Sequence, residues 1–406
     1  MQQEYQYSTL PCGLRIVTCH RENALVEHCG LAINAGSRDE IPGQFGLAHF
    51  VEHTIFKGTS RRRAWHILNC MERIGGELNA YTTKEETMVY TTAPSGYLAR
   101  ALDLVADLVT DSRFPTAEID RERQVVADEI DTYLDTPSEA VFDDFEELIF
   151  AGSPLAHNIL GSRESVAGLN SATCRRYLEY FYTPGEMVFF YSGPEKPARV
   201  EAMAARTFRN FSRPDNPRLR STPTAASRFD TIKTIGSHQA HTVLGTQLPG
   251  LNDPLRYAMS LLTNILGGPG MNSLLNVALR EKRGLVYTID ASTSLMTDTG
   301  LFNIYFGCDC EDVDRCLKLI EKTIRPLAET ELSPRRLAEA QRQYIGQLTI
   351  ASTNTEQGAL SMARSTLYRG HALTHKEMHE AISSVTPADI RECAGRLTEL
   401  SRLTLA

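Results

Sequence analysis

The chain has 406 residues, of which 42% are hydrophobic and 23% charged, and its formal net charge is −8. This length exceeds what one hydrophobic core usually supports, so at least two domains of ordinary globular composition are expected. The acidic balance argues against nucleic acid as the main partner, and no apolar run is long enough to suggest a membrane-spanning helix.

The cysteines and the amino terminus predict an intracellular protein. Nine cysteines are an odd number without a C-x-x-C spacing, which favours reduced thiols over a disulfide framework. Residues 1–5 have neither a basic start nor an apolar stretch, so no secretory signal is expected. We therefore expect a cytoplasmic location, unless a targeting segment precedes this sequence.

A short helix is predicted after two initial strands at residues 14–19 and 29–35. Its apolar positions recur at helical spacing, and a glycine closes it at position 58. This helix carries His49, Glu52 and His53 as the motif H-x-x-E-H. Because residues four apart lie on one helix face, the two imidazoles can bind one metal ion with Glu52 beside it. The motif indicates a zinc-activated water, and a core helix with two hydrogen-bonded histidines is the alternative.

Further strands are expected around Asn79 and at residues 88–93, followed by two helices that begin near Tyr97 and Thr116.

The second of these helices carries two carboxylates on one face. Glu122 and Glu129 are seven residues apart, with Val125 and Val126 pointing partly inward beside them. Two carboxylates that face an apolar neighbourhood need a cation. Glu129 follows His53 after 75 intervening residues.

This motif and spacing resemble the pitrilysin-type zinc metallopeptidases. The chain is similar to their half-length class, which includes mitochondrial processing peptidase beta subunits and bacterial relatives. The resemblance implies that one Zn²⁺ per chain is bound by His49, His53 and Glu129. It also implies that Glu52 is the general base and that Glu122 orients the metal ligands. For Glu122 alone, a solvated helix glutamate is the alternative.

Two other segments extend the resemblance. Residues 75–82 look like the family's strand beside the zinc helix, where the backbone of Asn79 and Ala80 pairs with an extended substrate. Residues 279–287 match an R-x6-Y element, in which Arg280 and Tyr287 contact substrate carbonyls and stabilise developing negative charge. By themselves these segments would be an ordinary hairpin and an ordinary helix end.

The predicted elements occur twice in the same order. The second set comprises strands at 242–247, 288–293 and 301–306 and helices at 257–266, from Val313 and from Pro334. At a constant offset of 218, Glu122 falls on Ala340 and Glu129 on Gln347, and the helix at 257–266 lacks histidine. We therefore predict an α+β fold of two homologous domains, each an antiparallel-rich sheet covered by helices, related by internal duplication.

The predicted boundaries follow from this duplication. Residues 1–208 form the zinc-binding catalytic domain, and residues 229–406 form a homologous domain without a metal site that carries Arg280 and Tyr287. Residues 209–228, rich in Arg, Pro, Ser and Asn without helical or strand periodicity, form the linker.

Other histidines give weaker signals. His375 and His379 have helical spacing, but Thr374 and Glu377 make a capping box that explains a plain helix start. His157 lies in a loop similar to the family's, and the sequence suggests no role for it.

The predicted function is that of a zinc metalloendopeptidase hydrolysing peptides or unfolded polypeptide segments. The alternative is a non-catalytic family member that serves as a structural partner subunit or a peptide-binding scaffold. Because full-length family members enclose a chamber with four such units and this chain has two, a homodimer is expected, or a heterodimer with a related chain. The physiological substrate and the cleavage specificity are not predicted, because an edge strand binds peptide backbone.

Overall fold

The computed structural model describes residues 4–216 and 218–406, which divide into two compact units. Each unit combines one mixed, mostly antiparallel sheet with helices, so the predicted fold class is confirmed. Unit 1 comprises Met1–Asp131, His157–Arg220 and Ser352–Thr374, and unit 2 comprises Thr132–Ala156, Ser221–Ala351 and His375–Ala406.

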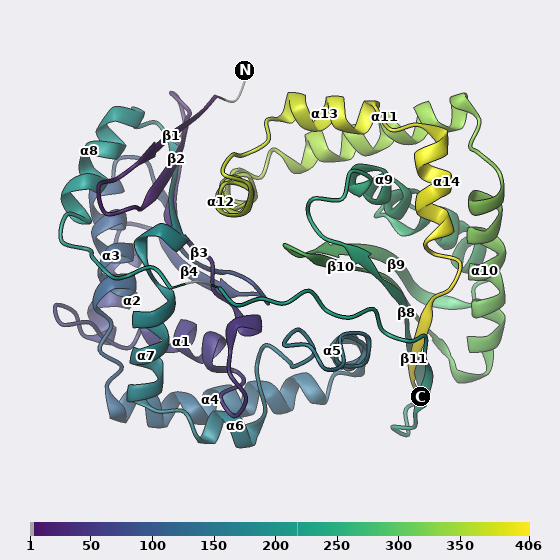
Figure 1. Cartoon of the computed structure of the whole chain (residues 1–406), viewed down its shortest axis with the longest axis horizontal. Coiled ribbons are helices and arrows are strands. Elements are labelled where there is room, and N and C mark those ends of the chain that lie inside the picture. Colours follow the sequence, from purple (N-terminus) through teal and green to yellow (C-terminus); the bar gives the residue numbers. More distant parts are fainter. Residues whose placement is uncertain (1–3, 217) are drawn as a thin grey trace. The chain divides into compact units, whose positions relative to one another are not determined.

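Unit 1 is built on a six-stranded sheet in the order β1-β2-β6-β3-β5-β4 (Figure 1). Only β2 and β6 run parallel. The strands are β1 (Tyr5–Thr9), β2 (Arg15–His20), β3 (Val26–Ile33), β4 (Glu77–Thr82), β5 (Thr87–Pro94) and β6 (Met187–Gly193).

Helices cover both faces of this sheet because successive strand residues point to opposite sides. In β3, Leu31 packs with the helices that follow in the first half of the chain, whereas Ala32 packs with α12. The helices of unit 1 are α1 (Leu47–Ile55), α2 (Ala64–Glu72), α3 (Leu98–Asp111), α4 (Thr116–Leu134), α6 (Arg163–Ala167), α7 (Ser171–Phe181), α8 (Pro197–Thr207) and α12 (Thr355–Arg369), with the short turns η1 (Ser37–Asp39) and η2 (Pro184–Glu186).

Unit 2 is built on a five-stranded sheet in the order β7-β11-β8-β10-β9. Its strands are β7 (Asp230–Lys233), β8 (Gln239–Pro249), β9 (Val286–Leu295), β10 (Thr299–Asp309) and β11 (Ser401–Leu405), of which only β7 and β11 run parallel. Its helices are α5 (Pro137–Ile149), α9 (Arg256–Gly267), η3 (Asn276–Glu281), η4 (Cys310–Asp312), α10 (Val313–Glu329), α11 (Pro334–Ala351), α13 (His375–Ser383) and α14 (Pro387–Gly395).

The two sheets have the same topology. If β1 is left out, the strand order of unit 1 is β2-β6-β3-β5-β4. Numbering these strands five higher gives β7-β11-β8-β10-β9, which is the strand order of unit 2. Helices α4 and α11 begin 218 residues apart, and so do α5 and α12. The chain therefore contains two copies of one fold.

The copies exchange one helix each, and here the units differ from the predicted boundaries. Val141 and Phe145 of α5 pack on the sheet of unit 2, whereas α12 from the second half packs on the sheet of unit 1. Each exchange buries an apolar helix face on the sheet of the opposite half. Residues 209–220 of the predicted linker group with unit 1, and Pro217 within it lies outside the described residues.

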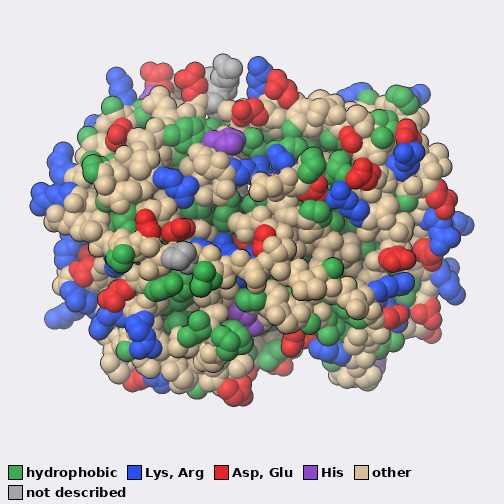
Figure 2. All heavy atoms as spheres, viewed as in Figure 1, with side chains coloured by type: hydrophobic (Ala, Val, Ile, Leu, Met, Phe, Trp, Pro, Cys, Tyr) green, Lys and Arg blue, Asp and Glu red, His purple; other side chains and the backbone are tan. Residues whose placement is uncertain are grey.

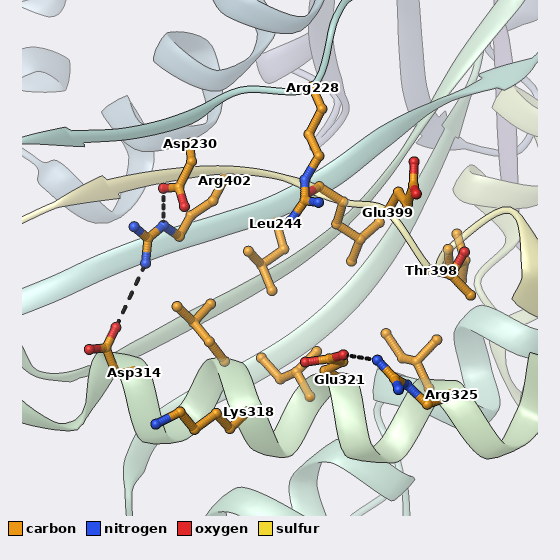
Figure 3. A pocket seen from close by; sticks show the side chains of 15 residues that line it. Arg228, Asp230, Leu244, Asp314, Lys318, Glu321, Arg325, Thr398, Glu399 and Arg402 are labelled. Carbon is orange, nitrogen blue, oxygen red and sulfur yellow. Dashed lines mark hydrogen bonds and ion pairs between the residues drawn. The ribbon is translucent and has the colours of Figure 1, made fainter.

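Unit 2 contains a cavity of about 680 Å³ between α10 and strands β7 and β11 (Figure 3). In unit 1, α8 packs against α3 and β2, the counterparts of α10 and β7. Charged side chains around the cavity pair with one another, as Arg402 does with Asp230 and Arg325 with Glu321. Among the described residues, its carboxylates form no group of three or more that could hold a metal ion.

Positive and negative side chains are interspersed over the visible surface (Figure 2). The Arg61-Arg62-Arg63 run illustrates this pattern, because Arg61 and Arg62 both pair with Asp103 and Asp107 of α3. Among the described residues, no helix is both long and apolar enough to cross a membrane.

Candidate metal centre

Helix α1 presents the metal-binding motif because its apolar side is buried in unit 1. Phe50, Val51 and Ile55 point into the core, which leaves the motif residues on the opposite side. Gly46 precedes the helix at φ +89°, and a Cβ there would come within 2.4 Å of the Leu160 carbonyl oxygen. The helix ends at Ile55, three residues before the predicted closure at position 58, because the backbone N–H groups of Phe56 and Lys57 both bond to the carbonyl of Thr54 and tighten the last turn.

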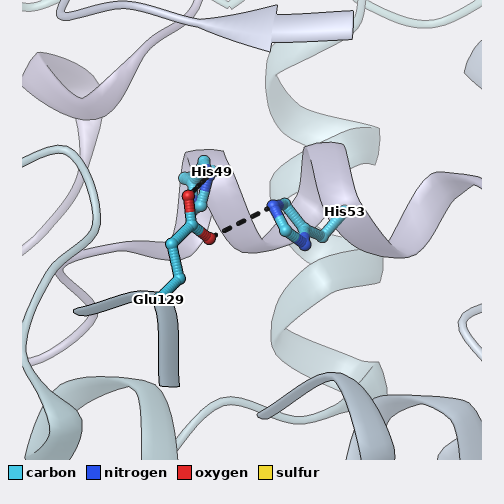
Figure 4. A group of neighbouring side chains, drawn as sticks. All are labelled: His49, His53 and Glu129. Carbon is cyan, nitrogen blue, oxygen red and sulfur yellow. Dashed lines mark ion pairs between the residues drawn. The ribbon is translucent and has the colours of Figure 1, made fainter. Parts of the chain in front are cut away.

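The structure brings His49, His53 and Glu129 together (Figure 4). The Nε2 atoms of His49 and His53 lie 3.8 and 3.6 Å from the two carboxylate oxygens of Glu129. The three potential ligand atoms all lie within 4.8 Å of one another. Among the described residues this is the one group of three or more metal-binding side chains, and His375 and His379 form no such group.

The geometry of this cluster fits zinc. The separations of 3.6 and 3.8 Å exceed a hydrogen bond, whereas a tetrahedral zinc ion with bonds of about 2.1 Å holds its ligands roughly 3.4 Å apart. Burial, and secondarily the neighbouring His53, lowers the pKa of His49 to about 3. His49 is therefore neutral at physiological pH, which is the form that binds a metal ion.

Glu122 holds His53 from the other side of its ring. Its carboxylate lies 3.0 Å from Nδ1 of His53 and 2.7 Å from Nζ of Lys57. Burial opposes ionisation of Glu122, but the hydrogen bonds from His53 and Lys57 outweigh it and lower the pKa. This arrangement leaves Nε2 of His53 facing Glu129 and excludes the alternative of a solvated helix glutamate.

Of the two valines predicted to point partly inward, Val126 is fully buried and Val125 is half exposed. The buried face of α4 runs through Ile119, Glu122, Val126 and Ile130, so Val125 lies on its flank.

Glu52 is oriented by the neighbouring strand β4. Its Oε2 accepts a hydrogen bond of 2.8 Å from the hydroxyl of Thr82. Burial is the largest effect on its carboxyl and raises the pKa, against the opposing influence of Thr82 and His53. Glu52 is thereby held on the same helix face as the two histidines.

Strand β4 lies at the edge of its sheet and carries Asn79 and Ala80. In the described structure it pairs with β5 on one side, so its other backbone edge remains available. The end of this strand reaches Glu52 through Thr82. An extended peptide added to this edge would therefore run beside the metal cluster.

Arg280 and Tyr287 both belong to unit 2, whereas the metal cluster belongs to unit 1. Arg280 lies near the end of η3 and Tyr287 at the start of β9, and both side chains are exposed. The Tyr287 hydroxyl donates a hydrogen bond of 2.7 Å to Asp309, which raises the pKa of the phenol.

The amino terminus of α1 is held by Glu40 and His157, a pair that the sequence did not predict. The buried carboxylate of Glu40 accepts hydrogen bonds from the backbone N–H groups of Gly46 and Ala48, at 2.8 and 2.6 Å. His157, whose ring stacks on Phe45 at 4.0 Å, places Nε2 3.0 Å from the same carboxylate. A capping residue normally directly precedes its helix, so Glu40, seven residues before α1, gave no signal.

In unit 2 an uncharged residue, Thr263, stands at the position of Glu52. The hydrogen bond from Thr82 to Glu52 has a counterpart of 2.7 Å between Thr293 and Thr263, each 211 residues further along the chain.

The metal-cluster residues of unit 1 have uncharged counterparts. At the same offset of 211, Ser260 replaces His49 and Asn264 replaces His53, while at the offset of 218 between α4 and α11 Ala340 replaces Glu122 and Gln347 replaces Glu129.

Comparison with known proteins assigns the family. Residues 15–163 match the family model described as Insulinase (Peptidase family M16), and residues 168–344 match the model described as Peptidase M16 inactive domain. An uncharacterized zinc protease of Streptomyces coelicolor is 34% identical over 408 residues, which cover 97% of this chain and 88% of that protein. The chain belongs to peptidase family M16.

Other relatives of this M16 chain agree. An uncharacterized zinc protease of Bacillus subtilis, YmxG, is 29% identical over 96% of this chain and 93% of that protein. The crystal structure of a protease from Helicobacter pylori superposes with a TM-score of 0.91 over the whole of both chains, at 20% identity. A peptidase M16 inactive domain from Pseudomonas fluorescens gives 0.89 at 19% identity, over 99% of this chain and 97% of that one. The resemblance to the pitrilysin-type family is thus confirmed, and the two structures show the shared fold.

Proposed function

We propose that this M16 chain is a zinc-dependent endopeptidase that hydrolyses peptides or unfolded polypeptide segments. The observation that carries the proposal is the cluster of His49, His53 and Glu129 with Glu52 on the same helix face. The Glu129 side chain is 43% exposed, so the cluster is open to a substrate. An available strand edge lies next to it.

The side chains divide the chemistry among them. His49, His53 and Glu129 would hold a zinc ion, which would supply a bound water of lowered pKa and a Lewis acid for the carbonyl of the scissile bond. Glu52, held by Thr82, would accept a proton from the attacking water and pass it to the leaving amine. Arg280 and Tyr287 donate hydrogen bonds to substrate carbonyl groups and stabilise negative charge as it develops.

The substrate backbone pairs with β4 at Asn79 and Ala80. Such pairing uses main-chain groups of both partners, so many sequences can bind in the same way. Peptides and unfolded segments present these groups, whereas the strands of a folded protein have already paired theirs.

The same proposal includes a cytoplasmic location. All nine cysteines are free. Reduced thiols are the normal state in a reducing compartment, where structural disulfides are rare.

The decisive experiment is mass spectrometry of the products from a mixed peptide library. We expect about one zinc per chain, cleavage within the peptides, loss of cleavage with a chelator and recovery on adding zinc back. Cleavage that persists in protein shown by elemental analysis to be free of metal would refute the zinc mechanism. A fully zinc-loaded protein that binds peptides and releases no product would instead indicate the alternative, a scaffold or partner subunit without catalysis.

We further propose a homodimer, in which the zinc unit of one chain meets the Arg280 and Tyr287 unit of the other. The resemblance to the family, whose full-length members enclose a chamber with four such units, implies that this chain supplies two of them. A two-fold axis then gives two equivalent sites. A heterodimer with a related chain is the alternative, and co-purification distinguishes the two.

Complementation between two inactive proteins tests this arrangement. We expect a mixture of Glu52→Gln with the double variant Arg280→Ala, Tyr287→Phe to recover about a quarter of wild-type activity. Random exchange makes half of the dimers hybrids, and each hybrid carries one intact site of two. No recovery, once subunit exchange has been shown by mass spectrometry of labelled chains, would place each site within one chain.

A further inference from the structure

Unit 2 has a second cavity, of about 270 Å³, between α9 and α11. These helices are the counterparts of α1 and α4, so the cavity corresponds to the metal cluster of unit 1. Its walls are formed by Asn264, Ile265, Asn272, Ser273, Leu274, Leu332, Arg336, Glu339, Ala340 and Gln343.

Shorter side chains explain why space remains here. Asn264 stands at the position of His53, and Ala340 at that of Glu122, which in unit 1 fills the space behind the imidazole. One wall is fixed by a reciprocal pair of hydrogen bonds between the amides of Asn272 and Gln343, at 2.9 and 3.1 Å. The cavity is therefore a defined space, in which neutral residues stand where unit 1 has His53 and Glu122.

One polar group that lines the cavity is buried without a partner among the described residues, the hydroxyl of Ser273. Asn264, which is only 8% exposed, lines the cavity as well. Arg336 is exposed and its guanidinium has no acidic partner in the described structure, whereas its neighbour Arg335 pairs with Glu339 at 3.0 Å. A buried polar group without a partner destabilises a fold, so the Ser273 hydroxyl indicates a missing ligand.

We propose that this cavity binds a small carboxylate with a short aliphatic body. The Arg336 guanidinium pairs with the carboxylate, and the Asn264 amide and the Ser273 hydroxyl donate hydrogen bonds to its oxygens. Ile265, Leu274 and Leu332 contact the aliphatic part.

Two sources share this chemistry, free aliphatic amino acids and short-chain fatty acids. The carboxylate of Glu339 lines the same cavity and pairs with Arg335 through one oxygen. Because a carboxylate has a second oxygen for an ammonium group, Glu339 favours the amino acid.

Isothermal titration calorimetry of the full-length protein tests the site, with L-leucine and 4-methylpentanoate as probes that differ by the ammonium group. We expect saturable binding of L-leucine with one site per chain, and weaker binding of 4-methylpentanoate. Arg336→Gln should lower the affinity at least ~10-fold, because a hydrogen bond to a charged group is lost. Asn264→Leu, which nearly preserves the side-chain volume, should also weaken binding.

The matched control is Arg342→Gln, an exposed arginine on the same helix and outside the cavity, which should leave the affinity unchanged. Glu52→Gln should bind L-leucine as the wild type does, so the result does not depend on peptidase activity. Stronger binding of 4-methylpentanoate would assign the site to fatty acids. No saturable binding of either probe, or equal binding by wild type and a folded Arg336→Gln protein, would overturn the proposal.

Discussion

Replacing Glu52 by glutamine is expected to lower the turnover number at least ~100-fold while the protein keeps its fold and about one zinc per chain. The amide can still accept the hydrogen bond from Thr82, so the geometry around α1 is preserved. It cannot take a proton from a bound water. Steady-state cleavage of a peptide, elemental analysis and thermal unfolding measure the three quantities separately.

An exposed glutamate of unit 1 provides the control for this variant. Glu72→Gln removes one negative charge at the end of α2 and should leave turnover unchanged. Wild-type turnover in Glu52→Gln would eliminate Glu52 as the general base. Loss of zinc from that variant would show that Glu52 supports the metal ion rather than the proton transfer.

The second large effect concerns the metal ligands. We expect His49→Ala and Glu129→Gln each to lower the affinity for zinc. The loss should exceed the roughly 10- to 100-fold that is typical when a residue hydrogen-bonded to a metal ligand is removed. Each change removes one of three protein ligands and leaves an incomplete site. Competition with a calibrated chelator gives the affinity, and peptide cleavage should fall with it.

A histidine outside the cluster serves as the comparison. His66→Ala removes an exposed imidazole from α2 and should bind zinc like the wild type. Full zinc occupancy at wild-type affinity in both ligand variants would reject the cluster as the metal site.

The duplication explains why the metal cluster of unit 1 has a neutral counterpart at the equivalent position of unit 2. In unit 1, Glu122 and Lys57 stabilise a cluster that needs a cation. In unit 2, Asn264 and Ala340 occupy the positions of His53 and Glu122, and the result is a small polar cavity. The backbone arrangement is retained, as the equivalent hydrogen bonds of Thr82 and Thr293 show, while the chemistry differs.

Features that depend on local periodicity could be predicted from the sequence. The spacing of His49, Glu52 and His53 places them on one face of a helix, and α1 has that face. The start of α4 at Thr116 and the strands and helices that recur in both halves were predicted for the same reason, whereas β1, β6, β7 and β11 were not predicted. Helical and strand periods act over a few residues, so they are visible in the chain itself.

The role of Glu129 could be predicted from local periodicity only in part. Its helix and its face followed from periodicity, but its meeting with His49 and His53 was inferred from the resemblance to a known family. The half-exposed Val125 shows the limit of such spacing arguments, because a residue at the flank of a helix is covered or exposed according to its neighbours.

By itself, the sequence determined the repeated α+β pattern and the residues of the metal-binding motif, since short-range periodicity and residue chemistry are sufficient for both. Only the tertiary structure decided that α5 and α12 pack on the sheets of the opposite halves and that Glu40 and His157 hold the start of the zinc helix. Each of these contacts joins residues far apart in the chain. Their formation depends on which apolar faces and polar groups meet once the sheets have assembled, and no local pattern encodes that choice.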